Sequence, residues 1–370
     1  MKFQPLFESQ QISQQTFSNR YIVAPMTRVS AESDGKANDR MKAYYERFAV
    51  GGFGAIISEG IYTDKHYSQG YRNQPGLASD MHVDAWKPVV EAVKAHGTKF
   101  IAQLMHGGAQ SQGNAYTDET IAPSATAPKG EQLAFYGGSG PYKTPKAMET
   151  KDFEQVREGF VQAAIHAKDA GFDGVELHAA NGYLLDEFLT EYMNLRDDEY
   201  GGSMEAGLGY VKEVADAVRL AVGESFIVGI RLSQGKVSDQ EYRWPGGEQG
   251  AENFFNLVKE LPLDYIHVTD ADGTAPSFGE HSRSIARLAK EVVGLPVIAN
   301  GKLGDPDKAL KAVTEEKADF VSIGATALAN PDTPNLVKAG KEQRAFDPTA
   351  ILFPEAFVKD AELEIQLEKR

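Results

Sequence analysis

The sequence predicts an α/β fold, a single (β/α)8 barrel of the TIM type with long loops after strands three and five. Eight short apolar, β-branched runs alternate along the chain with segments of helical spacing. Continuous apolar strands indicate a parallel sheet covered by helices, and eight such strands close a TIM barrel. A doubly wound open sheet is the alternative, but the sequence lacks the G-x-G-x-x-G turn that usually follows its first strand.

The strands are expected, in order, at 21–27, 55–61, 99–106, 174–178, 226–232, 265–269, 296–301 and 320–324. The 370 residues would suit two domains by length, but barrels reach this size as one unit. We therefore expect one domain over 1–370, with an N-terminal segment at 1–19 and a C-terminal tail at 346–370.

The segments between the strands carry the apolar stripe of helices that pack on a sheet. Apolar residues recur at i, i+3, i+4 and i+7. Two examples are Met41, Tyr44, Tyr45 and Phe48 after the first strand, and Phe254, Leu257, Val258 and Leu261 after the fifth. Capping residues agree with this assignment, because Gly51, Gly97 and Gly294 follow predicted helices and Asp305 precedes Pro306 at the start of another.

Two connections are longer than turns, at 107–150 and 233–247. Both follow strands, so they open onto the C-terminal face where barrel active sites lie. Ordinary insertion is one interpretation, since loops tolerate length. We favour a wall or lid over the site because the two loops share one face and carry aromatic side chains, namely Tyr116, Phe135, Tyr136, Tyr142, Tyr242 and Trp244.

Composition excludes several classes of function. The net charge of -15, with no basic run, disfavours nucleic acid and anionic membranes as partners. The chain has no cysteine, which excludes disulfides, thiolate metal sites and thiol nucleophiles. No signal peptide and no run of 18 apolar residues is present, so we expect a cytoplasmic protein.

The most informative candidate site follows the fourth strand, where His178, Asn181 and Tyr183 come within six residues. If the chain turns helically there, His178 and Asn181 share a face and can donate hydrogen bonds to one oxygen. Tyr183 could then supply a proton. The structural alternative is that His178 packs as a neutral imidazole and Asn181 caps the next helix.

Arg231 stands at the end of the apolar fifth strand, with no acidic residue adjoining it. A buried charge needs a partner. We expect an anionic or electron-rich ligand, with a salt bridge to Glu176 or Glu59 as the alternative. The turns after strands seven and eight, Asn300-Gly301-Lys302 and Gly324-Ala325, fit the place where TIM barrels often bind phosphate.

Together these motifs resemble the Old Yellow Enzyme family of FMN-dependent oxidoreductases. The resemblance rests on Ala24-Pro25-Met26-Thr27-Arg28, Gln103-Leu104-Met105-His106-Gly107-Gly108, His178-Ala179-Ala180-Asn181-Gly182-Tyr183 and the Asn194 to Ser203 segment. Further matches are Ala170 to Glu176 and Ala329-Asn330-Pro331-Asp332. These motifs run in family order from about residue 5 to 345.

The resemblance implies a barrel that holds FMN and receives hydride from a visiting NADH or NADPH. The residues implied for the flavin are Pro25, Met26, Thr27, Gly60, Gln103 and Arg231, with Asn300, Gly301, Lys302, Gly324 and Ala325 at the phosphate. Hydride would pass from flavin N5 to the β-carbon of an activated alkene, such as an enone, enal or nitroalkene. His178 and Asn181 would bind the substrate oxygen, and Tyr183 would protonate the α-carbon.

The chain departs from the family at several positions. One branch has a cysteine where Thr27 stands, and the family usually has a phosphate-binding arginine where Ala325 stands. Glu205-Ala206-Gly207 replaces Glu-Asn-Arg, and we recognise no family motif in the tail after Phe346. We hypothesise that Lys302 replaces the missing charge.

Two other functions remain open at this point. One is a flavin-binding barrel with lost or different turnover, and the other is a metal-dependent hydrolase with His106 and His178 as ligands. We expect no metal, and assembly with further copies of the chain is compatible with the sequence.

Overall fold

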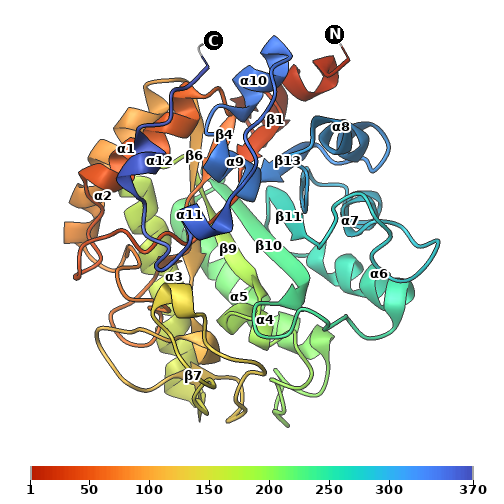
Figure 1. Ribbon diagram of the computed structural model, residues 1–370. Coiled ribbons are helices and arrows are strands. Elements are labelled where there is room, and N and C mark those ends of the chain that lie inside the picture. The colour runs from red at the N-terminus through yellow and green to blue at the C-terminus, as the bar shows by residue number, and fades with distance from the viewer. Residues whose placement is uncertain (1, 369–370) are drawn as a thin grey trace.

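The barrel wall consists of eight parallel strands in the computed structural model, which describes residues 2–368 (Figure 1). Met1 of the expected N-terminal segment, and Lys369 and Arg370 of the expected tail, lie outside the described residues. The strands are β3 (Tyr21–Val23), β4 (Ala55–Ile57), β6 (Lys99–Met105), β9 (Gly174–Asn181), β10 (Ile227–Lys236), β11 (Tyr265–Thr269), β12 (Val297–Asn300) and β13 (Phe320–Ile323). Pairing of β4 with β6 closes the sheet, so the predicted (β/α)8 barrel is confirmed.

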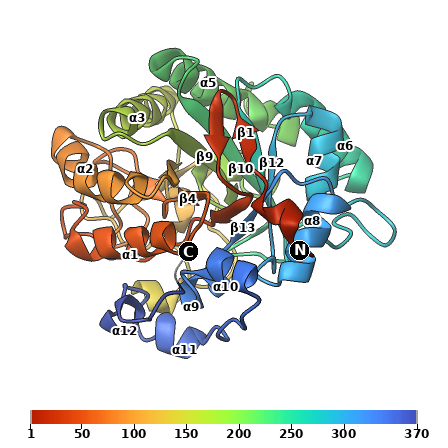
Figure 2. The same cartoon turned by 90° about the horizontal axis from the view of Figure 1, so that it is seen from above.

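Helices surround this barrel in a ring, which Figure 2 shows from above. They are α1 (Asp39–Val50), α2 (Asp80–Lys94), α3 (Thr150–Asp169), α5 (Met204–Val222), α6 (Gly247–Val258), α7 (Ile285–Val293) and α8 (Pro306–Thr314), followed by the shorter α9 (Ala325–Ala329) and α10 (Thr333–Ala339). A further short helix, α4 (Leu184–Glu187), follows β9. No helix in the described part of the chain is long and apolar enough to cross a membrane.

Most predicted helical stripes are buried. Met41, Tyr44, Tyr45 and Phe48 of α1 pack in the core, and the side chain of Asp305 caps α8 as expected. The stripe assigned to α6 is wrong at one position, because Leu257 is 40% exposed and Phe255 is buried. The buried face of α6 is Ala251, Phe254, Phe255 and Val258, which keeps the i, i+3, i+4, i+7 spacing but begins three residues earlier than predicted.

The barrel interior is arranged in levels along its axis. An apolar floor contains Ile101, Ile227, Ile298 and Phe320. Ile12 and Phe17, from the hairpin of β1 (Gln10–Ile12) and β2 (Gln15–Phe17), join this floor, and Figure 2 shows the hairpin lying across the barrel. Above the floor, the next inward-facing positions are polar. Above these lies a cavity at the carboxyl ends of the strands.

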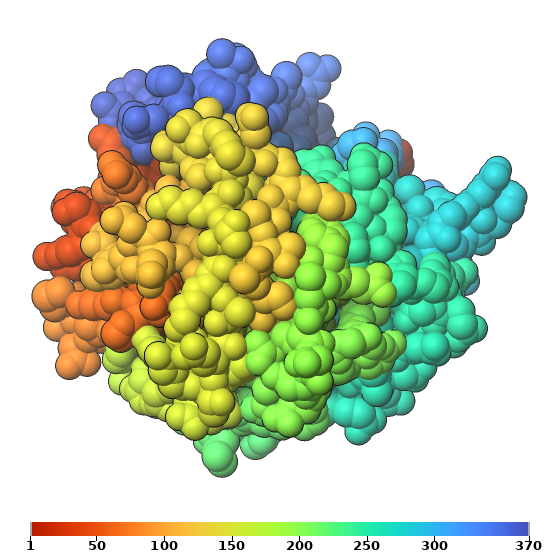
Figure 3. Space-filling model, turned by 90° about the horizontal axis from the view of Figure 1, so that it is seen from below, coloured from red at the N-terminus to blue at the C-terminus, as the bar shows by residue number. Residues whose placement is uncertain are grey.

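The long loop at 107–150 and the C-terminal tail meet on the face where the cavity opens. The loop contains β7 (Ile121–Ala122) and β8 (Lys146–Ala147), and the tail contains α11 (Pro348–Ile351) and α12 (Asp360–Leu363). Figure 3 shows the loop in yellow directly beside the tail in blue. The second expected loop is shorter than predicted, because β10 continues past residue 232 to Lys236.

Candidate active site

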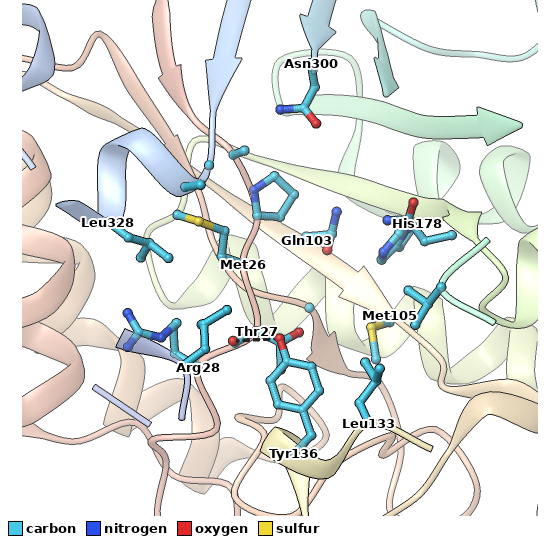
Figure 4. A pocket seen from close by; sticks show the side chains of 18 of the residues that line it. Met26, Thr27, Arg28, Gln103, Met105, Leu133, Tyr136, His178, Asn300 and Leu328 are labelled. Carbon is cyan, nitrogen blue, oxygen red and sulfur yellow. Dashed lines mark hydrogen bonds between the residues drawn. The ribbon is translucent and has the colours of Figure 1, made fainter. Parts of the chain in front are cut away.

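A cavity of about 380 Å³ opens at the carboxyl ends of the barrel strands (Figure 4). It is lined by twelve of the predicted site residues: Pro25, Met26, Thr27, Gly60, Gln103, His178, Asn181, Tyr183, Arg231, Asn300, Gly324 and Ala325. Gly301 and Lys302 are not among the lining residues. The predicted residues therefore converge on one site, with the exception of the turn after Asn300.

Pro25, Met26 and Thr27 follow the first barrel strand and line the cavity. The ladder of β3 stops at Val23, since Pro25 has no N–H with which to continue it. The hydroxyl of Tyr136 donates to the Thr27 carbonyl at 3.1 Å, which ties the long loop to this strand end. Opposite, Gly60 leaves room for Met105, because a Cβ at residue 60 would lie 2.5 Å from the Met105 Sδ.

His178 and Asn181 reach the same cavity, but not by the helical turn that we expected. Strand β9 runs to Asn181, whose φ of 63° is left-handed and reorients the chain at that point. The Asn181 N–H donates to the Ser233 Oγ at 2.8 Å, and its carbonyl accepts the Val237 N–H at 2.9 Å. The extension of β10 therefore holds Asn181 in place. The capping alternative for Asn181 is wrong, because α4 begins after Tyr183.

The His178 imidazole is 3% exposed, and its Nδ1 has no hydrogen-bond partner among the described residues. Burial, reinforced by the nearby Arg231, holds the His178 pKa well below its ordinary value. The ring is therefore neutral at pH 7. The alternative of a packed imidazole with satisfied hydrogen bonds is not supported, since buried polar atoms usually have a partner and this Nδ1 has none among the described residues.

Tyr183 packs edge-on against His178, with ring centroids 4.9 Å apart. Its hydroxyl lies 2.6 Å from the hydroxyl of Tyr71. Burial raises the pKa of Tyr183 to about 12, and the hydrogen bond with Tyr71 opposes that rise. Tyr183 is thus a protonated phenol at the cavity wall.

A buried ion pair near these residues was not predicted from the sequence. The Lys236 Nζ lies 2.7 Å from both carboxylate oxygens of Asp186, and both side chains are 1% exposed. Asp186 also accepts the Gly182 N–H at 2.7 Å. The pair therefore fixes the turn between Asn181 and Tyr183. The ion pair could not be predicted because the expected strand ended at residue 232, whereas β10 continues to Lys236.

Arg231 is 6% exposed and forms no salt bridge with a described residue. Its Nη2 donates to the Asn300 Oδ1 at 3.2 Å, and its Nε has no partner among the described residues. Thr269 donates to the same Asn300 oxygen at 2.7 Å. Neither proposed carboxylate pairs directly with Arg231: Glu59 accepts the Arg28 N–H, and Glu176 accepts Gln103. An unpaired cation thus faces the cavity.

The predicted phosphate end is poor in positive charge. Gly324 and Ala325 line the cavity, whereas Lys302 is exposed outside it in a left-handed conformation, φ 53°. Among the described lining residues, Arg28 and Arg231 are the cations.

Loop and tail complete the wall of the cavity. Leu133, Phe135 and Tyr136 come from the long loop, and Phe346 and Leu352 from the tail. These residues agree with the interpretation of the loop at 107–150 as a wall of the site. The other predicted loop aromatics, Tyr116, Tyr142, Tyr242 and Trp244, are not among the lining residues.

The hydrolase alternative required His106 beside His178. His106 is buried outside the set of cavity-lining residues, and its Nδ1 accepts the Gly108 N–H at 3.1 Å. Within residues 2–368, no three His, Cys, Asp or Glu side chains are grouped so that they could hold a metal ion.

Comparison with known proteins shows the family to which this chain belongs. The model of the NADH:flavin oxidoreductase / NADH oxidase family matches residues 5–344. An NADH oxidase from Thermoanaerobacter brockii is 31% identical over 348 residues, which is 92% of this chain and 52% of that longer protein. A probable flavin mononucleotide-dependent alkene reductase from Leishmania infantum is 34% identical over 339 residues, covering 90% of this chain and 89% of the relative.

A solved structure has the same fold over nearly the whole chain. The old yellow enzyme homologue from Zymomonas mobilis superposes with a TM-score of 0.86 at 28% identity, covering 98% of this chain and 99% of that one.

Proposed function

Because the chain belongs to the NADH:flavin oxidoreductase / NADH oxidase family, we propose that it reduces activated alkenes such as enones, enals and nitroalkenes. FMN is its cofactor, and NADH or NADPH is the hydride donor. The main support for the proposal is that one cavity is lined by the three proposed catalytic residues and by two proposed flavin contacts. These are His178, Asn181 and Tyr183, and Arg231 and Gln103. We further propose that the whole chain acts as one FMN-binding unit.

The residues present fit a flavin. The Arg231 Nε lacks a partner among the described residues and suits an electron-rich ring edge. Gln103 presents an amide to the same cavity, and Gly60 leaves the wall free of a side chain. Pro25, Met26 and Thr27 would face the flavin through their backbone. When bound, FMN supplies hydride; the protein supplies the binding and the proton.

His178 and Asn181 suit the role of donors to the carbonyl or nitro oxygen of the substrate. The Asn181 side chain makes no hydrogen bond to another described residue, and a neutral His178 has one N–H to give. Two donors aimed at an oxygen that gains charge stabilise the transition state by about 2.7–4 kcal/mol each. Tyr183 would deliver the proton to the α-carbon.

The phosphate of FMN would lie against the turns 300–302 and 324–325. Backbone N–H groups there supply positive potential. We propose that the Lys302 side chain, which forms no ion pair with a described residue, adds the charge that Ala325 lacks.

The test separates the two half-reactions by anaerobic stopped flow. In Tyr183→Phe, reduction of FMN by NADH or NADPH should proceed as in the wild type, and reoxidation by cyclohexenone should slow at least tenfold. Tyr210→Phe is the control, since Tyr210 is equally buried but donates to the Phe153 carbonyl away from the cavity. Unchanged reoxidation would assign the proton to another acid. FMN binding without any turnover would favour the alternative of a flavin-binding barrel.

A further inference from the structure

A fully buried carboxylate lies inside the barrel, below the cavity and outside the groups used so far. Glu176 is 0% exposed and stands on β9 two residues before His178, so both face the barrel interior. The neighbouring inward positions on β6, β11 and β13 are Gln103, His267 and Ser322. These four residues form a polar level between the apolar floor and the cavity.

Three donors converge on the Glu176 carboxylate. The Gln103 Nε2 lies 2.8 Å from Oε1, while the Tyr265 hydroxyl and the His267 Nδ1 each lie 2.9 Å from Oε2. The His267 Nε2 in turn lies 2.8 Å from the Ser322 Oγ. Burial opposes ionisation of Glu176, but His267, these hydrogen bonds and the nearby Arg231 outweigh it and lower the Glu176 pKa. Glu176 is therefore a carboxylate at pH 7.

The backbone is adapted to this network at Gly229. On β10, Gly229 pairs with Glu176 on one side and with Tyr265 on the other. A Cβ at residue 229 would lie 2.1 Å from the Tyr265 ring. Glycine therefore allows the tyrosine to cross the strand and reach the carboxylate.

The carboxylate determines how the Gln103 amide is oriented. An ionised carboxylate only accepts hydrogen bonds, so Gln103 must turn its Nε2 toward Glu176. The Gln103 Oε1 then accepts no hydrogen bond from a described residue, although Gln103 lines the cavity. An acceptor is thus presented to the cofactor site, where it suits a ring N–H.

Glu176 also offsets the charge of Arg231. Glu176 is the carboxylate that raises the Arg231 pKa against the lowering effect of burial, yet the two form no ion pair. A buried carboxylate is costly, and an apolar side chain would fill the barrel at lower cost, as Ile101 and Ile227 do at the floor. Glu176 lies beside Gln103 and one inward position below Arg231, which indicates a role toward the cofactor.

We propose that Glu176 is a positioning residue for FMN, which fixes the acceptor orientation of Gln103 and, by its negative charge beneath Arg231, lowers the reduction potential of the bound flavin. The proposal rests on FMN binding and does not depend on the alkene substrate.

The test measures the midpoint potential of bound FMN by equilibration with a reference dye. Glu176→Gln removes the charge and keeps the shape, so we expect a potential more positive by about 30 mV or more, which is a tenfold gain in preference for reduced FMN. Asp152→Asn is the control, because Asp152 is also buried and pairs with Lys146, but contacts neither Gln103 nor Arg231. It should leave the potential unchanged.

A second variant keeps the test decisive if Glu176→Gln does not fold. Tyr265→Phe removes one donor and leaves the carboxylate charged, so the potential should become more negative. Equal potentials in the wild type and in either variant that folds would overturn the proposal. Fluorescence titration of each apoprotein with FMN comes first: failure of the wild type to bind FMN would contradict the proposed function, whereas binding without a potential shift would contradict this inference alone.

Discussion

Arg28 and Glu362 form a two-point ion pair across 334 residues of chain. The Nη1–Oε2 and Nη2–Oε1 distances are 2.8 and 2.6 Å, and the side chains are 1% and 9% exposed. Arg28 also donates from Nε to the Ala356 carbonyl at 2.9 Å. Since Arg28 directly follows Thr27, the pair ties the tail to a strand end that lines the cavity.

Glu362→Gln should loosen this tail. Removing one partner of a buried pair leaves an uncompensated charge and costs about 3–5 kcal/mol. We expect a lower free energy of unfolding in guanidinium chloride and faster FMN release, because Phe346 and Leu352 of the tail line the cavity. Glu364→Gln is the control, since Glu364 is exposed on the same segment. Equal FMN release in both variants would show that the tail does not retain the cofactor.

Tyr71→Phe should slow substrate protonation without affecting FMN reduction. The hydrogen bond from Tyr71 lowers the Tyr183 pKa, so its loss makes Tyr183 a weaker acid. A neutral hydrogen bond is worth about 0.5–1.5 kcal/mol, which corresponds to a slowing of up to about tenfold. The rate of reoxidation of reduced FMN by cyclohexenone, followed by stopped flow across pH 6–10, measures this slowing. Wild-type rates at every pH would show that Tyr71 only packs against Tyr183.

The barrel could be predicted because its signals are local. Each strand is an apolar run, and each helix carries a stripe within a dozen residues, so periodicity suffices. The ends of strands depend on other segments. Strand β10 runs past residue 232 because its last residues pair with Asn181 and because Lys236 forms an ion pair with Asp186. The periodicity of β10 itself contains no information about either contact.

The site was predictable where a polar residue ends an apolar strand, as at His178 and Arg231. Glu176 and His267 were missed as a group, although each stands two residues from a strand-end residue and so faces the interior. Tyr71 and Glu362 gave no such signal. Their roles arise from contacts 112 and 334 residues away, which only the folded chain reveals.

Lys302→Ala should weaken FMN binding and leave riboflavin binding unchanged. A charge-assisted hydrogen bond is worth about 1.5–3 kcal/mol, so the Kd for FMN should rise about tenfold or more. Lys259→Ala is the control, since Lys259 is exposed at the end of α6. Fluorescence titration of the apoprotein measures both ligands. An unchanged Kd for FMN would remove Lys302 from the phosphate site, and Ala325→Arg should then still tighten FMN over riboflavin.

His106→Asn should make stability less sensitive to acid. Burial lowers the His106 pKa from 6.5 to about 4, so the folded state excludes a proton that the unfolded chain binds. The exclusion of this proton makes the free energy of unfolding depend on pH. The contribution of the neutral His106 to stability is fully present above pH 6.5 and is lost as the pH falls toward 4. It amounts to about 3 kcal/mol.

Asparagine suits the position because its Oδ1 can accept the Gly108 N–H that the Nδ1 of His106 now accepts. Unfolding in urea at pH 7 and pH 4.5 should therefore show a smaller loss of stability in His106→Asn than in the wild type. His281→Asn, at a side chain that is 90% exposed, should lose as much stability as the wild type. Parallel losses in all three proteins would mean that other groups account for acid unfolding.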